Sequence, residues 1–300
     1  MSEERRFAFF VHPASGNGRA TRRLKRALDC VARSKETTLP LAQRSRVIET
    51  RSLSETRAGL RSLRGDEIPV AAGGDGALQY LVRALRCEGL RSRLVGVLPL
   101  GTGNAFAHSI GLATLKEAIL ALDAGRARAL DLMVTTHPDA TVVVASLSVG
   151  FEAEFIRSWN RARLNGSLPG GLVALARAAT TRTAAPQLWL DGASSSLTGS
   201  TVWSAGLYNI SHYAFGKLVI PECDPSDAAA EAIVYRDAWA YVRALATGKG
   251  SVSRGVERRR WRIASVETSG PIQADGETLP GRDLAVHVEP GGLRVIAMCR

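Results

Sequence analysis

An acidic residue enclosed by glycines is the most informative short stretch of this 300-residue chain. In "VAAGGDGALQYLV" (70–82), an apolar segment runs into three glycines around Asp75, and an amphipathic pattern follows at once. Glycine at a strand-to-helix turn lets the backbone approach a ligand closely. A carboxylate there repels a phosphate unless a cation bridges the two, so the stretch favours a phosphate site that includes Mg²⁺.

Two further turns of small residues follow apolar segments, "HPASGNG" (12–18) and "GTGN" (101–104). Ligands of open parallel sheets bind at the carboxyl ends of the strands, where free backbone amides attract anions. The sequence has neither the P-loop pattern nor G-x-G-x-x-G, which disfavours P-loop and dinucleotide-binding Rossmann folds. Three such turns together favour a phosphate-bearing ligand over three ordinary turns.

The elements that must position these turns alternate between strand and helix over the first 130 residues, which is typical of a mostly parallel sheet covered on both faces. Ser54 is a plausible N-cap for one of the helices. The apolar patterns predict strands over 6–11, 45–50, 68–72 and 93–100, and helices over 20–33, 54–64 and 77–86.

From Asp131 onward most segments resemble antiparallel strands, which predicts a β-sandwich. "TVVVASLSVGF" (141–151) and "RRRWRIASVET" (258–268) each read as one strand. Two helices are expected among them, over 170–180 and 237–248.

The net charge of +11 lies almost entirely in the first 130 residues, which hold 22 basic and 12 acidic residues. This favours attraction to anions such as nucleotide phosphates or an acidic membrane face. Arginines that merely cover solvated helices are the alternative, because the basic residues are dispersed. No nucleic-acid partner is expected, since no helix-turn-helix, zinc-finger or RNP-type signature is present.

The remaining composition favours an intracellular protein. No apolar run reaches the roughly 18 residues of a membrane helix, and the first residues lack the basic region of a signal peptide. The four cysteines form no C-x-x-C pair, so neither a disulfide framework nor a zinc site is expected.

Three motifs in this order, "GGDG" (73–76), "PLGTGNAFAHSIGL" (99–112) and "QADGE" (273–277), resemble the diacylglycerol kinase catalytic-domain family. That family includes sphingosine, ceramide and bacterial lipid kinases. The resemblance spans nearly the whole chain and implies a nucleotide-binding α/β domain over 1–130, like that of phosphofructokinase and NAD kinase. It also implies a lipid-substrate β-sandwich over 131–286, with about 287–300 returning to the first domain.

The resemblance implies an ATP- and Mg²⁺-dependent lipid kinase that phosphorylates a hydroxyl of a diacylglycerol-like or long-chain-base lipid. Glu277 would accept the hydroxyl proton, with Asp75 and Asp275 as further catalytic residues; Glu154 would contact the lipid and Asp227 a metal. The implied nucleotide-binding residues are Ser15, Gly16, Thr50, Gly73, Gly74, Asp75, Gly76, Ala77, Gly101, Thr102, Gly103 and Asn104.

Plainer readings remain open for single residues: Thr50 as an ordinary strand end, "DGE" as a solvated β-turn, and Glu154 as an exposed strand residue. His12, Ala77 and Ala105 depart from the family pattern, and Ala228 replaces a glycine. A catalytically weakened lipid- or nucleotide-binding protein and an NAD-kinase-like enzyme are therefore alternatives. We expect a cytoplasmic protein peripherally bound to a membrane surface, and whether it forms a homodimer stays open.

Overall fold

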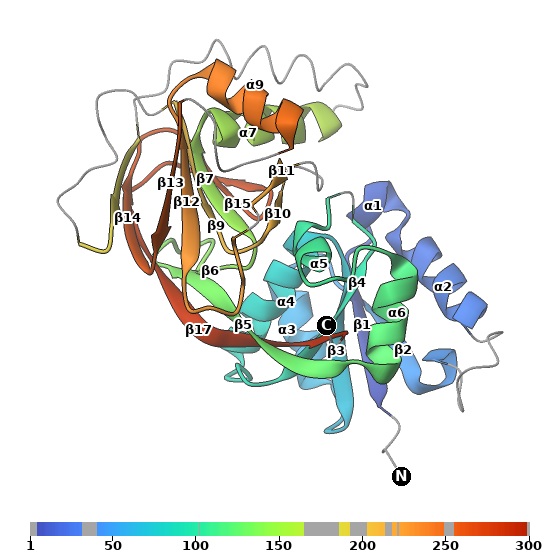
Figure 1. The fold of residues 1–300 in the computed structure, drawn as a ribbon. Helices are drawn as coiled ribbons and strands as arrows, with labels where there is room; N and C mark the ends of the chain where they lie inside the picture. The colour runs from blue at the N-terminus through green and yellow to red at the C-terminus, as the bar shows by residue number, and fades with distance from the viewer. Residues whose placement is uncertain are drawn as a thin grey trace. The chain divides into compact units, whose positions relative to one another are not determined.

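The structure is a computed structural model that describes residues 5–31, 41–101, 103–164, 186–192, 203–213, 218–220, 222–248 and 255–298. The chain divides into two compact units (Figure 1). Unit 1 comprises Met1–Leu130 together with Gly291–Arg300, and unit 2 comprises Asp131–Pro290. Within the described parts, no helix combines the length and apolar character that crossing a membrane requires.

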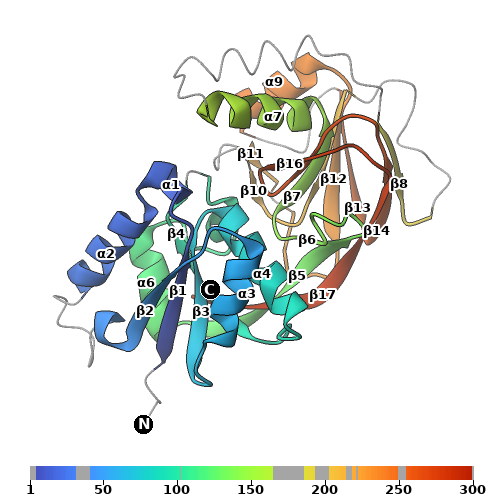
Figure 2. The same ribbon diagram turned by 180° about the vertical axis from the view of Figure 1, so that it is seen from behind.

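Unit 1 is built on a parallel sheet in the order β2-β1-β3-β4, and the end of β17 joins β4 in parallel through Arg294 and Val295. Helix α6 lies on one face of this sheet, and α3 and α4 lie on the other (Figures 1 and 2). The strands are β1 (Arg6–Val11), β2 (Ser45–Glu49), β3 (Glu67–Gly73), β4 (Leu94–Pro99) and β17 (Leu284–Ala297), and the helices are α1 (Ser15–Gly18), α2 (Ala20–Val31), η1 (Leu41–Arg44), α3 (Leu53–Arg61), α4 (Asp75–Cys87), α5 (Ala105–Ser109) and α6 (Leu115–Ala124).

The central strands of unit 1 are apolar without alternation because both of their faces are covered. Every residue of β1 after Arg6 is buried, and so is every residue of β4 after Leu94. The predicted N-cap of α3 is wrong: the Ser52 hydroxyl, not that of Ser54, accepts the Glu55 amide at 3.1 Å. The Glu55 carboxylate also accepts the amide of Arg51, the residue before the cap, at 2.8 Å, and the two bonds together fix the earlier start.

Unit 2 is a β-sandwich, as predicted, with one sheet in the order β13-β12-β9-β7-β15-β16. In the facing sheet, β14 pairs antiparallel with β8 and β17, and β5 pairs with β6. Apolar side chains of both sheets form one core around Trp261. The elements are β5 (Arg126–Thr135), β6 (Val142–Val143), β7 (Ser146–Gly150), α7 (Phe151–Leu164), β8 (Gln187–Leu190), β9 (Ser204–Tyr208), β10 (His212–Tyr213), β11 (Leu218–Val219), β12 (Ala230–Tyr235), α9 (Ala238–Thr247), β13 (Val256–Trp261), β14 (Ile263–Glu267), β15 (Ile272–Ala274) and β16 (Glu277–Leu279).

Two segments predicted as single strands are interrupted, and in both a carboxylate takes the backbone amides at the break. Over 141–151, the chain forms β6, a break and β7, and α7 begins at Phe151. Over 258–268, β13 ends at Trp261 and β14 begins at Ile263 in the facing sheet, because Asp191 accepts the amides of Arg262 and Ile263 at 2.9 Å each. The helix expected over 237–248 is α9, and the one expected over 170–180 lies outside the described residues.

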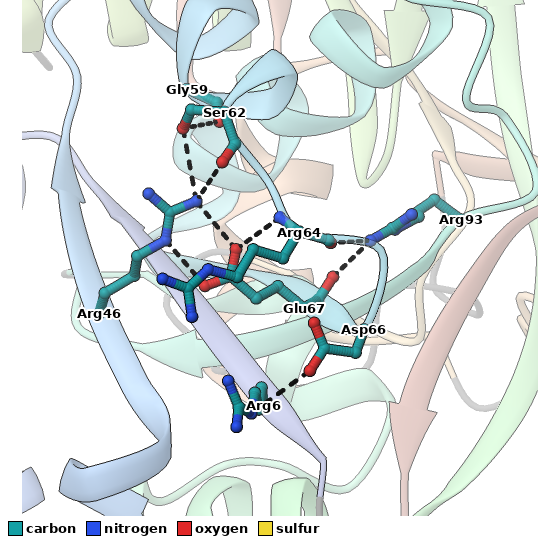
Figure 3. Close-up of polar contacts among 8 residues, drawn as sticks. All are labelled: Arg6, Arg46, Gly59, Ser62, Arg64, Asp66, Glu67 and Arg93. Atoms are coloured by element: carbon teal, nitrogen blue, oxygen red, sulfur yellow. Dashed lines mark hydrogen bonds and ion pairs between the residues drawn. The ribbon is translucent and has the colours of Figure 1, made fainter.

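A buried glutamate holds the start of β3 to its surroundings (Figure 3). The Glu67 carboxylate accepts two hydrogen bonds from Arg46, at 2.8 and 2.9 Å, and one from the Arg64 amide at 2.8 Å. The Glu67 carbonyl accepts a further bond from Arg93. Burial raises the pKa of Glu67, but the bonds from Arg46 and Arg64 outweigh it and hold the pKa below its usual 4.5.

We expect Glu67→Gln to lower the free energy of unfolding of the protein by about 1–3 kcal/mol at pH 7, because the amide cannot accept the full set of bonds. Urea unfolding measures the loss. The matched control is Asp66→Asn, whose ion pair with Arg6 is more than half exposed on both sides and should matter little.

The same difference should depend on pH with a defined sign. A carboxylate whose folded-state pKa is depressed contributes stability above its unfolded pKa and loses it as the pH falls through the folded value. The gap between wild type and Glu67→Gln should therefore close as the pH drops below 4.5. A gap of constant size from pH 7 to pH 3 would contradict this account of Glu67.

Candidate active site

The three glycine turns of unit 1 touch one another through their backbones. A Cβ on Gly16 would lie 2.6 Å from the carbonyl oxygen of Leu100, the residue before the "GTGN" turn. A Cβ on Gly101 would lie 2.4 Å from the Cα atom of Gly74. Backbone this close leaves no room for side chains, so the glycines are required by packing as well as by any ligand.

The first turn, 12–18, also meets the "GGDG" turn through a side chain. The Ser15 hydroxyl lies 3.3 Å from where a Cβ on Gly73 would be. His12 replaces the asparagine typical of the family, and its Nδ1 accepts the Ala14 amide at 3.1 Å. This is the bond to the second following amide that asparagine makes in an Asx-turn, so His12 preserves the shape of the turn.

Asp75 joins the "GGDG" turn to the "GTGN" turn. Its two carboxylate oxygens accept the amides of Ala105 and Phe106, at 2.9 Å each, and so cap the start of α5. Asn104, just before α5, is left-handed at φ 52°. Its side chain accepts the Gly101 amide and donates to the Gly101 carbonyl, both at 3.0 Å. These bonds fix the conformation of the "GTGN" turn beside Asp75.

The electrostatics of Asp75 suit a nearby cation. Burial raises the pKa of its carboxyl, and the amides of Phe106 and Ala105 offset this only in part. The amides that the two oxygens accept leave further lone pairs available. Among the described residues no group of three or more His, Cys, Asp or Glu side chains could hold a metal alone. Mg²⁺ often binds through one or two carboxylates, phosphate oxygens and water, and Asp75 fits that pattern.

The other predicted nucleotide-binding residues lie at the same edge of the unit 1 sheet, with one exception. Thr50 is buried at the end of β2, where its amide donates to the Val11 carbonyl at 2.9 Å. Thr102 lies outside the described residues. The structure brings together Ser15, Gly16, Thr50, Gly73, Gly74, Asp75, Gly76, Ala77, Gly101, Gly103 and Asn104 in the turns and strand ends of this edge.

In unit 2, the "DGE" motif forms a tight hairpin between β15 and β16. Asp275 and Gly276 have φ angles of 49° and 89°, as the two central residues of a type I′ turn require. Glu277 follows as an exposed residue that pairs with Ala274. The Asn160 side chain donates to the Gly276 carbonyl at 2.9 Å and adds support from α7.

Asp275 is the buried anchor of that hairpin. Its carboxylate accepts the amides of Val144, Ala145 and Ser146 at 2.8, 2.7 and 3.1 Å. Val144 and Ala145 separate β6 from β7, and Ser146 is the first residue of β7, so one carboxylate holds both the strand break and the hairpin. The geometry gives Asp275 a positioning task, and its predicted catalytic role stays a prediction.

Comparison with known proteins places this geometry in a family. The model of the diacylglycerol kinase catalytic domain matches residues 6–135. The model of the YegS C-terminal NAD kinase beta sandwich-like domain matches residues 145–297. The chain belongs to the diacylglycerol kinase-like lipid kinases. The resemblance inferred from the three motifs is thereby confirmed.

Individual relatives agree with that assignment. A probable lipid kinase YegS-like of Pseudomonas aeruginosa strain UCBPP-PA14 is 29% identical over 236 residues, which cover 75% of each chain. A probable lipid kinase YegS of Shigella flexneri is 43% identical over 65 residues, covering 21% of this chain and 22% of its own. A crystal structure of a diacylglycerol kinase from Bacillus anthracis str. Sterne has the same fold, with a TM-score of 0.67 at 14% identity, covering 99% and 98% of the chains.

The predicted lipid contact of this lipid kinase lies on α7. Glu154 is buried, and its Oε1 pairs with Arg157 at 2.6 Å. Its Oε2 has no hydrogen-bond partner among the described residues. The alternative reading of Glu154 as an exposed strand residue is therefore wrong, because α7 begins at Phe151 and turns this side chain inward. Contact with a lipid stays a prediction.

The predicted metal ligand Asp227 is occupied by protein groups. Its carboxylate pairs with Arg260 at 2.9 Å and accepts the Ala229 amide at 3.2 Å. Ala228, which lies between Asp227 and Ala229 in the chain, has a left-handed backbone at φ 61°. Its amide donates to the buried Asp131 carboxylate at 2.7 Å. Sequence reasoning missed Asp131. The available signal was the position of this acid within the apolar run "ALDLMV".

A second buried acid on α7 was also missed. Glu152 is 1% exposed, and its Oε2 accepts the Tyr208 hydroxyl at 2.9 Å. Burial raises the pKa of Glu152 to about 6, although hydrogen bonds from Tyr213, Tyr208 and Ser148 act against the rise. Its position within "SVGFEAEF" was the only signal in the sequence.

We expect Gly101→Ala to lower the free energy of unfolding by about 1–3 kcal/mol, because the new Cβ would meet backbone that cannot step aside. Chemical unfolding of the purified protein measures this. Gly65→Ala is the matched control, since a Cβ there meets nothing within 4 Å and the backbone is not left-handed. Equal stability of the two variants would show that the turns are not in contact.

Glu152 should make the protein less stable as the pH rises. A carboxyl whose folded-state pKa is raised gives its full stability below the unfolded pKa of 4.5 and loses it as the pH passes about 6. We expect Glu152→Gln, which stays neutral, to gain about 1–2 kcal/mol over wild type between pH 5 and pH 8. Urea unfolding at both pH values tests this, and parallel changes in the two proteins would contradict it.

Proposed function

We propose that this lipid kinase transfers the γ-phosphoryl group of ATP, with Mg²⁺, to a hydroxyl of a diacylglycerol-like or long-chain-base lipid. The observation that carries the proposal is the contact of three glycine turns around Asp75. Phosphoryl transfer needs positioning and charge neutralisation more than covalent chemistry from the protein. A cradle of backbone amides with one carboxylate supplies both.

Unit 1 would bind the nucleotide. Backbone amides of the turns at 12–18, 73–76 and 101–104, together with the start of α4, would hold the phosphate oxygens. Asp75, with lone pairs left after capping α5, would hold the cation beside them. When bound, Mg²⁺ would neutralise charge on the transferred phosphoryl group. Burial raises the pKa of Asp75, and a neighbouring cation would stabilise its ionised form.

Unit 2 would supply the proton acceptor. Glu277 is exposed on a short hairpin, and Asp275 fixes that hairpin through three buried hydrogen bonds. A carboxylate on a rigid support can accept the hydroxyl proton as the oxygen attacks phosphorus. Asp275 would then act through Glu277, as a positioning residue.

We expect Glu277→Gln to cut kcat by roughly 10²–10⁴ while ATP affinity and unfolding free energy stay unchanged. The assay uses labelled ATP, Mg²⁺ and a total lipid extract in mixed micelles, with identification of the phosphorylated product. The matched control is Glu267→Gln, an exposed glutamate on β14 of the same unit, which should retain full activity.

Two results would overturn the proposal. Turnover of Glu277→Gln above about a tenth of wild type, a barrier change below ~1.4 kcal/mol, would remove Glu277 as the proton acceptor. Phosphorylation of NAD in preference to every lipid in the extract would replace the lipid substrate with a dinucleotide.

A further inference from the structure

The outer face of α9 in unit 2 is unusually apolar for a surface helix. Three large apolar side chains among the described residues are more than half exposed: Trp239 at 73%, Ile263 at 58% and Val242 at 51%. Two of them, Trp239 and Val242, lie three residues apart on α9 and therefore on the same face. Exposed Ala246 continues the stripe one turn further on.

The inner face of the same helix is already used. Ala240, Tyr241 and Ala244 are buried in a core cluster with Tyr208 and Tyr235. The helix is capped at both ends: the Asp237 side chain accepts the Ala240 amide at 2.7 Å, and Gly248 is left-handed at φ 67°. The outer stripe is thus held at a fixed place on a well-anchored helix, and its large side chains do not belong to the core formed by the described residues of unit 2.

The charge on α9 fits an anionic or zwitterionic surface. Its sequence, "AWAYVRALAT", holds Arg243 as its single charged residue and no acid. Arg243 is exposed on the same face as Trp239 and Val242. Tryptophan and arginine beside an aliphatic stripe are typical of helices that lie in the interface of a membrane.

The size of the stripe argues against a second copy of the chain. Even a fully exposed tryptophan offers no more than about 250 Å², and one valine and one alanine add little. Stable protein interfaces bury about 800 Å² on each partner. A membrane interface needs no such area, because a few inserted side chains and one basic residue can contribute without a complementary protein surface.

The geometry points to α9 as the membrane-docking element of this kinase, with Trp239 and Val242 inserted among lipid headgroups and Arg243 facing lipid phosphates. The helix has 10 residues and is about 15 Å long, so it would lie along the surface. This inference deepens the proposed function, since a kinase of membrane lipids must meet its substrate at the bilayer.

Vesicle co-sedimentation of the full chain tests the inference. The probe is a vesicle of phosphatidylglycerol and phosphatidylcholine at a ratio of 3 to 7. We expect the double variant Trp239→Ser/Val242→Ser to lose at least about tenfold in partition coefficient. Arg243→Gln should lose less than the double variant in the same assay. Ile263→Ser is the matched control, because it removes a similarly exposed apolar side chain from β14 of the same unit.

The outcomes separate this inference from the proposed function. Loss of vesicle binding in the double variant, with unchanged turnover of a monomeric short-chain diacylglycerol, supports both. Vesicle binding that depends on Trp239 in a protein that phosphorylates no lipid supports docking and rejects the proposed function. Unchanged vesicle binding by the double variant overturns the inference. A wild-type dimer in vesicle-free buffer that the double variant cannot form overturns it as well, since the stripe is then a contact between copies.

Discussion

The carboxylate of Asp75 holds two glycine turns together, "GGDG" and "GTGN". By accepting the amides of Ala105 and Phe106, it starts α5 directly after the "GTGN" turn and holds that turn against "GGDG". Desolvating a carboxylate is costly, and two amide bonds offset only part of that cost. The site is therefore organised around a carboxylate whose charge the protein stabilises only in part.

Unit 2 uses the same chemistry for a different purpose. Asp275 and Asp191 each accept amides from a segment remote in sequence, and each marks a break between strands. Asp275 is buried and fully engaged, whereas Glu277 two residues later is exposed. One short hairpin thus carries both a buried acid that supports the backbone and an exposed acid two residues later.

The sequence predicts much of this arrangement because glycine turns and apolar periodicity are local signals. The "GGDG" and "GTGN" turns, the α/β fold of unit 1 and the sandwich of unit 2 follow from them. Breaks at Ala145 and Arg262 could not be predicted, since each depends on a carboxylate brought from elsewhere by tertiary folding. Glu152 and Asp131 were missed for the same reason: an acid in an apolar run shows its burial only once its partners are known.

Strand β17 gives unit 1 a particular order of assembly. Its last residues pair with β4, yet all of Asp131–Pro290 intervenes in the chain. During synthesis on the ribosome, β4 is made long before β17. Until β17 pairs with it, β4 is an unpaired sheet edge, to which other chains can bind. Unit 2 is thus an insertion within unit 1. Its folding shortens the length of flexible chain between β4 and β17, which lowers the entropic cost of pairing these two strands. Completion of the unit 1 sheet is consequently tied to the synthesis of β17, after all of unit 2.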